Sequence, residues 1–365
     1  MIRPVDLRTA PFSARCDGVH DDSPAFNAAI VYAAAHPDPA VLGKGGAPQG
    51  VVHVPYSATG RNTCRIDHVR VRSNVRLVID PGVTVEQYGD ARGFLLSLAG
   101  TTNTSILAGA VPPGIATDHW RVDVDAARTG GNRDIHPIQV GDGSYAEIEG
   151  PSFLANWSQP QTPPAAARFK TTSAMIHYGD GANNVWLENA SAWHIPAGYG
   201  LTEVNAGDHL YFAGIFSQGG VTLRLETNPS KSSDGIDTVE ATGVSGKRGL
   251  EAVDLSAHSL SITNVVVTGV TARGEGRGIH ITNAGGYADP GGGTVTATIT
   301  GGCVVAGRRA QIRTGDDVWR VGRSVTAVDA TGVDPTQLHF TVTGVGAAGT
   351  FARGPGPYVD PSIAC

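Results

Sequence analysis

The chain has 365 residues, of which 49 are glycine and 22 are proline, and only 16% are charged. A hydrophobic content of 41% is too high for a disordered protein, and this composition is typical of many short strands joined by tight turns. The net charge of −6, without a clustered basic run, argues against nucleic acid as the main partner, and no apolar stretch reaches membrane-spanning length.

The first predicted element is a short amphipathic helix that begins near residue 23. Asp22 or Ser23 suits the N-cap, and Pro24 suits the first helical turn. The predicted apolar face consists of Phe26, Ala29, Ile30 and Ala33. Such a helix would close the open end of a β-solenoid, whose first coil otherwise exposes apolar side chains and unpaired strand edges.

The acidic and cysteine residues near this helix are assigned structural roles. We expect turn and capping chemistry rather than a metal site from Asp17, Asp21 and Asp22. The simplest disulfide pairing is Cys16 with Cys64 and Cys303 with Cys365, which would tie down both ends of a solenoid. Four buried thiols are the alternative, and no cysteine spacing suggests zinc.

Short strands with period-2 alternation follow the helix at residues 51–54, 65–71 and 74–85. The segments DGVHDDSPAFNAAI, VVHVP and NVRLVIDPGVTV together resemble the opening of pectin-lyase-fold proteins, a group that includes polygalacturonases, other glycosidases and lyases, and phage tailspikes. The resemblance implies an all-β fold, a right-handed parallel β-helix with a short N-terminal capping helix.

A coarse repeat begins near residue 174, and its predicted coils start roughly 20 to 32 residues apart. We therefore expect a single β-helix domain over residues 1–365. Its predicted parts are an N-terminal cap (1–50), first coils (51–109), a loop-rich excursion (110–173), central and C-terminal coils (174–345) and a C-terminal tail (346–365).

Aligning the coils on their first apolar residue predicts which side chains leave the core. Leu250 and Ala252 are expected to point inward together with Val221, Leu223 and Leu225. The predicted outward column contains His177, Thr202, Thr222, Glu251, His280 and Gln311. The next column holds Arg224 and Arg313, and Glu226 lies one step further along. Such a density of chemical groups on adjacent coils exceeds what solubility requires.

Glycoside hydrolysis needs a carboxylic acid that protonates the leaving oxygen and a second group that acts as nucleophile or activates water. Glu226, Glu251 and Asp254 lie on neighbouring predicted coils. Arg224 can bind an acidic sugar or lower the pKa of a carboxyl group, and His258 can orient water or substrate.

Two segments near these residues, GGVTLRLETN (219–228) and GLEAVDLSAHS (249–259), are similar to a signature of iota-carrageenase-type glycosidases. The resemblance implies that Glu226 is the general acid and His258 an assisting histidine. The position of the family's base is occupied by Asn228, and an amide cannot take a proton from water. The resemblance therefore leaves the base to Asp234, Asp237 or Asp254, or to a different reaction.

These observations predict a glycoside hydrolase that cleaves a polysaccharide or oligosaccharide, possibly an acidic one. The predicted catalytic residues are Glu226, Asp254, Asp234 and His258, and the predicted substrate-binding residues are Arg224, Glu251, His280, His177 and Glu203. Neither a metal nor a cofactor is expected, and the oligomeric state is left open. The first residues show no signal-peptide pattern, so a secreted, extracellular protein would have lost its signal.

Two other functions stay open at this point. A polysaccharide lyase or epimerase would need an Arg or Lys base, for which Arg224, Lys247 and Arg248 are candidates. A non-catalytic or tailspike-like β-helix that binds glycans would need no acid. Polygalacturonase is disfavoured because SSDGID, which contains Asp234 and Asp237, is not followed by that family's remaining motifs.

Overall fold

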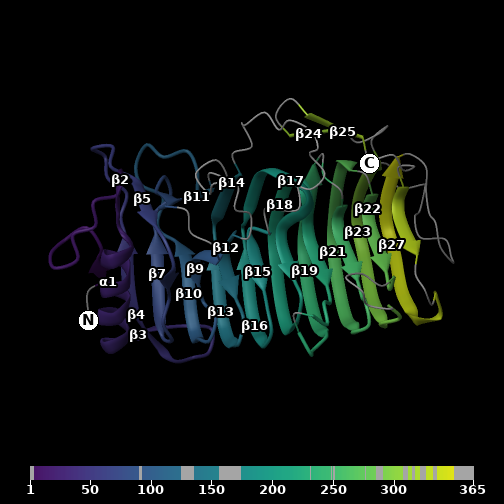
Figure 1. Cartoon of the computed structure of the whole chain (residues 1–365), viewed down its shortest axis with the longest axis horizontal. Coiled ribbons are helices and arrows are strands. Elements are labelled where there is room, and N and C mark those ends of the chain that lie inside the picture. The colour runs from purple at the N-terminus through teal and green to yellow at the C-terminus, as the bar shows by residue number, and fades with distance from the viewer. Residues whose placement is uncertain are drawn as a thin grey trace.

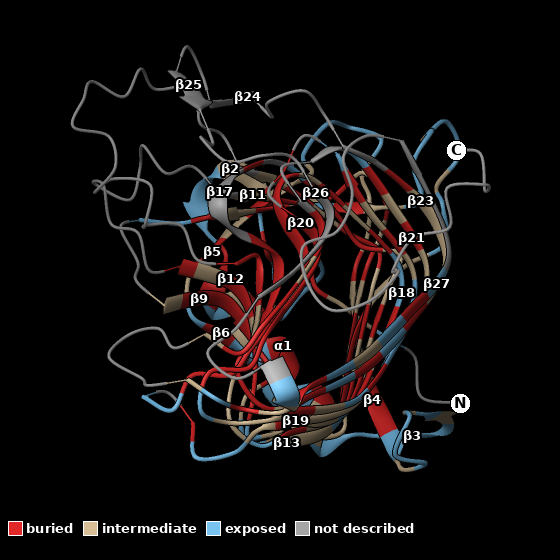
Figure 2. Ribbon diagram, turned by 90° about the vertical axis from the view of Figure 1, so that its right-hand side faces the viewer, coloured by how far each residue is buried: buried red, intermediate tan, exposed pale blue. Residues whose placement is uncertain are grey.

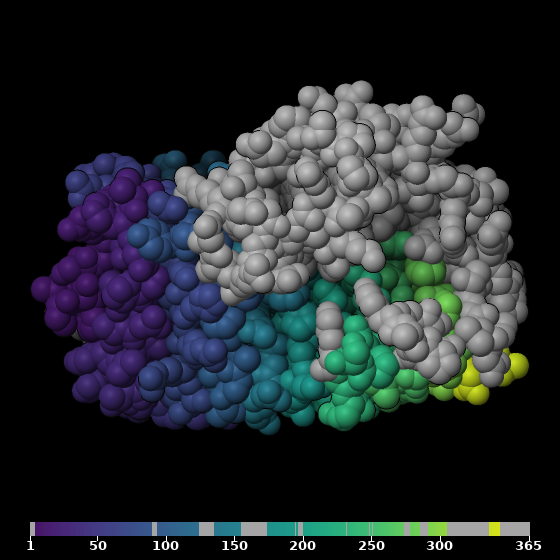
Figure 3. Space-filling model, in the orientation of Figure 1, coloured from purple at the N-terminus to yellow at the C-terminus, as the bar shows by residue number. Residues whose placement is uncertain are grey.

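Short strands wind in successive coils along one axis, and helix α1 (Ser23–Ala35) lies at the N-terminal end of the coils (Figure 1). The computed structural model describes residues 4–89, 93–124, 135–155, 174–230, 232–247, 249, 251–275, 277–284, 291–306, 311–314, 317–320, 326–331 and 335–348. Figure 3 shows the coils following one another along the long axis in sequence order. The described part contains no helix long and apolar enough to span a membrane.

Each coil contributes strands to three faces of the solenoid. On each face, the strands of successive coils pair in parallel. The first face contains β4 (Pro48–Val54), β7 (Val75–Ile79), β10 (Thr102–Ala108), β13 (Gly143–Glu149), β16 (Ala182–Glu188) and the first parts of β18 (Gly207–Glu226), β19 (Ile236–Lys247), β21 (Ile262–Glu275), β23 (Val295–Ala306) and β27 (Leu338–Ala348). The second face contains β2 (Asp17–Asp21), β5 (Thr63–Ile66), β8 (Thr84–Gln87), β11 (Trp120–Val124), β14 (Pro151–Ala155), the first part of β17 (Ser191–Val204), the middle of β18 and the later parts of β19, β21, β23 and β27.

The third face contains β6 (Val69–Arg70), β9 (Gly93–Ser97), β12 (Ile135–Val140), β15 (Ile176–Tyr178), the end of β17, the end of β18, β20 (Glu251–Ser256), β22 (Arg277–Thr282) and β26 (Thr326–Thr331). Together with the capping helix, this architecture confirms the predicted right-handed parallel β-helix.

The chain turns between the first and second faces at residues with positive φ. The same position in six successive coils is occupied by Gly150, Asn189, Gly214, Gly243, Gly269 and Gly301. Glycine and asparagine adopt the left-handed conformation more readily than other residues, so the corner can repeat without steric cost. This stacking of equivalent corners keeps the strands on either side in register.

Buried residues recur along the strands that surround the interior of the coils (Figure 2). On the third face, one inward row runs through Leu96, Ile138, Ile176, Thr202, Leu223, Val253 and Ile279, and the residues of this row are at most 1% exposed. Because successive side chains of a strand point to opposite sides, the residues next to this row leave the core.

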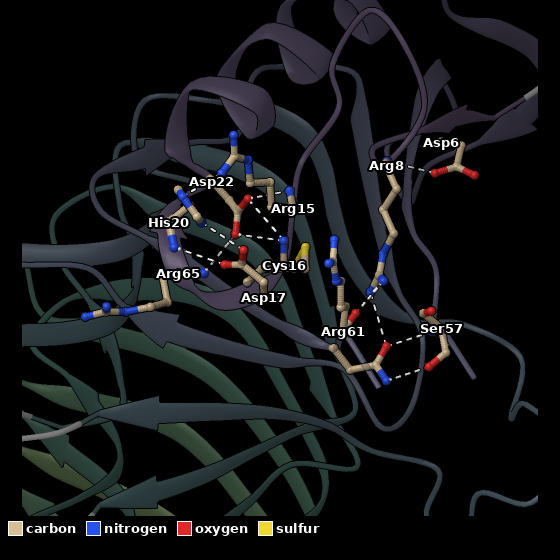
Figure 4. The surroundings of a disulfide bond; sticks show 12 residues. Asp6, Arg8, Arg15, Cys16, Asp17, His20, Asp22, Ser57, Arg61 and Arg65 are labelled. Atoms are coloured by element: carbon tan, nitrogen blue, oxygen red, sulfur yellow. Dashed lines mark hydrogen bonds and ion pairs between the residues drawn. A yellow bond between two sulfur atoms is a disulfide. The ribbon is translucent and has the colours of Figure 1, made fainter. Parts of the chain in front are cut away.

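The N-terminal end is closed as predicted. Helix α1 (Ser23–Ala35) buries Phe26, Ala29, Ile30 and Ala33, and Asp22 is its N-cap residue. Asp22 has no side-chain capping bond; its carboxylate instead accepts hydrogen bonds from the backbone N–H groups of Arg15, Cys16 and Arg65 (Figure 4).

Cys16 and Cys64 form the predicted disulfide, which links β5 to the segment before β2. Cys365, the predicted partner of Cys303, lies outside the described residues, so the second pairing stays a prediction.

The remaining elements lie at the edges of the three faces. β1 (Val5–Asp6) pairs with β4 in parallel and β3 (Asp38–Leu42) pairs with it antiparallel. A 3-10 helix (Pro335–Gln337) precedes β27.

Two predicted boundaries are wrong. Residues 110–173 are not one excursion, since β11, β12, β13 and β14 fall in this range and pair with the neighbouring coils. Gln311 and Arg313 do not belong to a coil, because β24 (Gln311–Thr314) pairs antiparallel with β25 (Asp317–Arg320). The coil position expected for them is taken by β26, which pairs with β22. Because residues 110–173 contain many Pro, Trp and charged residues, the short strands in this range were not recognised from the sequence.

Candidate active site

A polar row runs along the outer side of the third face, next to the inward row. Its members, in register on successive coils, are Arg70, Ser97, Gln139, His177, Glu203, Arg224, Asp254 and His280. The polar row shares His177 and His280 with the predicted outward column, but on the three coils between them it contains Glu203, Arg224 and Asp254 in place of Thr202, Thr222 and Glu251. Thr202 belongs to the inward row, and Glu203 takes its expected place. Glu251 is in register with Val221 rather than with His280, and Asp254 takes its expected place.

Three charged side chains of the predicted site meet where β18 and β20 pair. Arg224 Nη2 lies 2.6 Å from Glu226 Oε2, and Arg224 Nε lies 3.7 Å from Asp254 Oδ2. Arg224 and Asp254 are in register on adjacent strands, and Glu226 follows Arg224 by two residues on the same outer side. The guanidinium group therefore bridges two carboxyl groups that approach it from different coils.

Glu226 also contacts His258, which follows β20. Glu226 Oε1 lies 3.2 Å from His258 Nε2, and His258 Nδ1 lies 2.8 Å from the carbonyl oxygen of Ala284. A carbonyl oxygen only accepts hydrogen bonds, so Nδ1 carries a proton. In the neutral ring Nε2 is then an acceptor, and its contact with Glu226 requires one proton between the two groups. Glu226 and His258 are 5% and 7% exposed, so this proton is held away from bulk water.

Asp254 contacts a second histidine on the following coil. Its Oδ1 lies 2.9 Å from His280 Nδ1 and accepts a 2.7 Å hydrogen bond from the Ser256 hydroxyl. Burial alone would raise the pKa of Asp254, but the hydrogen bond and charge of His280, the charge of Arg224 and the Ser256 hydroxyl together lower it to about 2. Asp254 is therefore an ionised acceptor at neutral pH.

Asn205 connects the first part of the polar row to Glu226. Its Oδ1 lies 2.8 Å from His177 Nε2, and its amide donates to the backbone carbonyl of Glu226 at 2.9 Å and to Glu203 Oε1 at 3.4 Å. The ring of His177 stacks on His136 with centroids 4.2 Å apart. Asn205, Ser256 and His136 were not identified from the sequence. The pairing register of the coils is the signal that would have revealed them.

The structure thus brings together seven of the predicted site residues, Glu226, Asp254, His258, Arg224, His280, His177 and Glu203, on one face. Glu251 is 2% exposed and lies outside the polar row. Asp234 is exposed and lines a depression of about 450 Å³ with Asp208, Asp237 and residues of the first face, and none of the seven contributes to its lining.

Asn228, which occupies the position of the family's base, stabilises a turn with its side chain. Its Oδ1 accepts hydrogen bonds from the backbone N–H of Ser230 at 3.1 Å and from the Ser230 hydroxyl at 2.6 Å. Asp237 is likewise engaged by Thr263 and Asn264, whose hydrogen bonds lower its pKa, with the Thr263 bond the largest cause. Neither residue is positioned to serve Glu226 as a partner in proton transfer.

Metal binding has no support at this site. Within the described residues, one group of three His, Cys, Asp or Glu side chains has ligand-like spacing, namely Cys16, Asp22 and Cys64. Its two sulfur atoms form the disulfide and are not available as thiolates.

No protein-family model matches the chain. An iota-carrageenase from Zobellia galactanivorans is 32% identical over 111 residues, which cover 28% of this chain and 23% of that protein. The match therefore spans about a quarter of the length of the curated relative.

Solved structures match over nearly the whole chain. An iota-carrageenase complexed to iota-carrageenan fragments aligns with a TM-score of 0.73 at 15% identity, covering 100% of this chain and 94% of the other. A 1,3-alpha-1,4-beta-D-galactose-4-sulfate-3,6-anhydro-D-galactose-2-sulfate 4-galactohydrolase gives 0.72 at 16% identity with the same coverage. A family GH82 iota-carrageenase from A. fortis gives 0.70 at 16% identity, covering 97% of this chain and 88% of the other. At these identities the likeness shows a shared fold.

Proposed function

We propose that the protein is a glycoside hydrolase that cleaves a polysaccharide, with Glu226 as the proton donor. The observation that carries this proposal is the chain of contacts from Glu226 through His258 to the Ala284 carbonyl, which requires a proton between the carboxyl group and the ring. The partial sequence match to an iota-carrageenase supports the same reaction class.

In the proposed reaction, the proton shared by Glu226 and His258 moves to the glycosidic oxygen as its bond to the anomeric carbon breaks. Arg224 holds Glu226 Oε2 at 2.6 Å, which leaves Oε1 as the oxygen that handles the proton. His258 keeps its orientation because Nδ1 is fixed to Ala284. Positive charge that develops on the sugar ring lies near the ionised Asp254, and this arrangement stabilises the transition state.

The substrate-facing side chains of the proposal are those of the polar row on the coils around Glu226, namely His177, Glu203, Arg224 and His280. Asp234 and Glu251 are left out because the structure places them elsewhere. A polysaccharide is met outside the cell, and the disulfide between Cys16 and Cys64 suits an oxidising compartment, so the proposed location is extracellular.

Hydrolysis is favoured over elimination by the state of the basic residues. Arg224, the predicted lyase base, is engaged in ion pairs with two carboxyl groups and stays protonated there. Lys247 is in register with Gln218 and Arg273 on the second face, away from Glu226. Arg248 lies outside the described residues.

The test is a screen of the wild type and Glu226→Gln against neutral, uronate-containing and sulfated polysaccharides. Reducing ends and ultraviolet absorbance are read together. We expect new reducing ends without absorbance, lost in Glu226→Gln and kept in Glu240→Gln, which changes an exposed glutamate on the first face. Absorbance from unsaturated ends would establish a lyase instead. Full activity of Glu226→Gln would move the site away from β18.

A further inference from the structure

Hydrolysis also needs a group that takes a proton from the attacking water, and Asn228 cannot supply it. An amide has no basic lone pair at neutral pH, and the Asn228 side chain is bonded to Ser230. The carboxylate of Asp254 is a weak base, because its pKa is about 2. A better base has to stand on the same face of the solenoid.

His280 has the geometry of such a base. Its Nδ1 lies 2.9 Å from Asp254 Oδ1, and an ionised carboxylate only accepts, so Nδ1 carries the proton in the neutral ring. Nε2 then holds the basic lone pair. Among the residues that the structure describes, Nε2 of His280 has no hydrogen-bond partner. Asp254 is itself fixed by Ser256 and Arg224, so the ring is held in one tautomer and one orientation.

His280 and Glu226 lie on different coils of the same face. His280 lies two coils beyond Arg224 in the polar row, and Glu226 lies two residues beyond Arg224 along β18. With coils about 4.8 Å apart and about 3.3 Å per residue, the two Cα atoms are about 12 Å apart. Both residues belong to the outer side of the third face, and β20 runs between their strands.

We propose that His280 is the general base of the hydrolysis and that Asp254 is its positioning residue; this inference rests on the proposed function. Nε2 takes one proton from water as the water oxygen bonds to the anomeric carbon. The bond from that carbon to the glycosidic oxygen breaks, and the leaving oxygen receives the proton held between Glu226 and His258. Proton exchange with solvent then returns both groups to their starting states. The imidazolium ion formed at His280 is stabilised by the adjacent Asp254 carboxylate.

Among the described residues, the charged positions aligned with His280 come from neighbouring coils. Asp254 is in register with it on β20, Arg224 follows one coil further on β18, and Asp329 is in register with it on β26. The carboxylate that contacts the ring is that of Asp254.

The test uses the full chain and the polysaccharide that the wild type cleaves in the screen above. His280→Ala should lower kcat by about 10²- to 10⁴-fold, with a much smaller change in KM. Added imidazole should restore part of the lost kcat, because it supplies the missing base to the space left by the ring. His209→Asn, at an exposed position near the start of β18 where φ is positive and asparagine is tolerated, is the matched control and should keep wild-type kcat.

The outcomes separate the two proposals. If Glu226→Gln is inactive and His280→Ala keeps its kcat within a few-fold of the wild type, the hydrolase stands and the base assignment is overturned. The assignment also fails if folded His280→Ala loses kcat but gains nothing from imidazole. If the wild type cleaves no polysaccharide, the proposed function fails, and the role of His280 fails with it. Circular dichroism and melting temperature establish that each variant is folded.

Discussion

Replacing Asp254 by asparagine tests the electrostatics of the site through stability alone, whatever the substrate is. The pKa of Asp254 is about 2 in the folded protein, against an ordinary value of 3.8. This difference corresponds to about 2 kcal/mol of folding free energy. The asparagine Oδ1 can still accept the hydrogen bond from His280, so the substitution removes the charge and keeps the shape.

The sign of the effect follows from linkage. A carboxyl group whose pKa is lowered by folding stabilises the folded state above the unfolded pKa, and this contribution disappears as pH falls through the folded pKa. The free energy of unfolding of Asp254→Asn should therefore be about 2 kcal/mol lower than that of the wild type at pH 6. The difference should shrink to about half near pH 3 and almost vanish near pH 2.

Urea unfolding followed by tryptophan fluorescence at pH 6, 4 and 3 measures this difference. Asp234→Asn is the control, because it makes the same substitution at an exposed aspartate that has no ion pair among the described residues. A difference that is absent at pH 6, or that is the same at pH 6 and pH 3, would refute the reasoning.

Three further predictions concern the scaffold. Replacing both Cys16 and Cys64 by serine opens a link across 48 residues and should lower the unfolding free energy by about 4 kcal/mol, measured by urea unfolding; equal midpoints would contradict it. Gly243→Ala should lower the free energy of unfolding by about 1 kcal/mol, because φ is +67° at this residue. Gly243→Asn should lower it less, because Asn189 occupies the equivalent corner; equal losses for the two variants would be evidence against conformational strain. Phe26→Ala should cost about 3 to 5 kcal/mol by emptying the contact between α1 and the first coil, and an unchanged melting temperature would rule this out.

The fold could be predicted because its signals are local. Asp22, Pro24 and the apolar face around Phe26 and Ile30 specify a helix without reference to the rest of the chain. Alternation over residues 74–85 specifies strands in the same way, as β7 and β8 confirm. The composition excludes a helical protein, and a solenoid is the architecture that many short strands of this kind can build from contacts between neighbours.

The site was harder to predict because its members come from different coils, and one residue of register decides which of them face outward. Alignment on the first apolar residue assumed regular strands. β17 instead contains irregularities between Ala192 and Ile195 and between Ile195 and Gly200. Every residue of β20 is buried, so alternation of burial could not correct the alignment around Glu251. The repeated corner of glycine and asparagine was a usable marker of register, since Gly214, Gly243 and Gly269 stack directly.

The environments of the two histidines explain why they are assigned opposite tasks. Both rings use Nδ1 as a donor, but His258 donates to the neutral carbonyl of Ala284 and His280 donates to the Asp254 carboxylate. The Asp254 carboxylate stabilises the imidazolium ion that forms when Nε2 of His280 takes a proton from water. The contact between His258 Nε2 and Glu226 holds one proton between the two groups, so this pair is suited to release one.

The same difference predicts how activity responds to Asp254→Asn. Without the carboxylate, the imidazolium ion that forms at His280 during the reaction loses its stabilising partner, so kcat should fall while KM changes little. An Asp254→Asn variant that keeps the wild-type kcat would contradict the role of Asp254 as the positioning residue of His280.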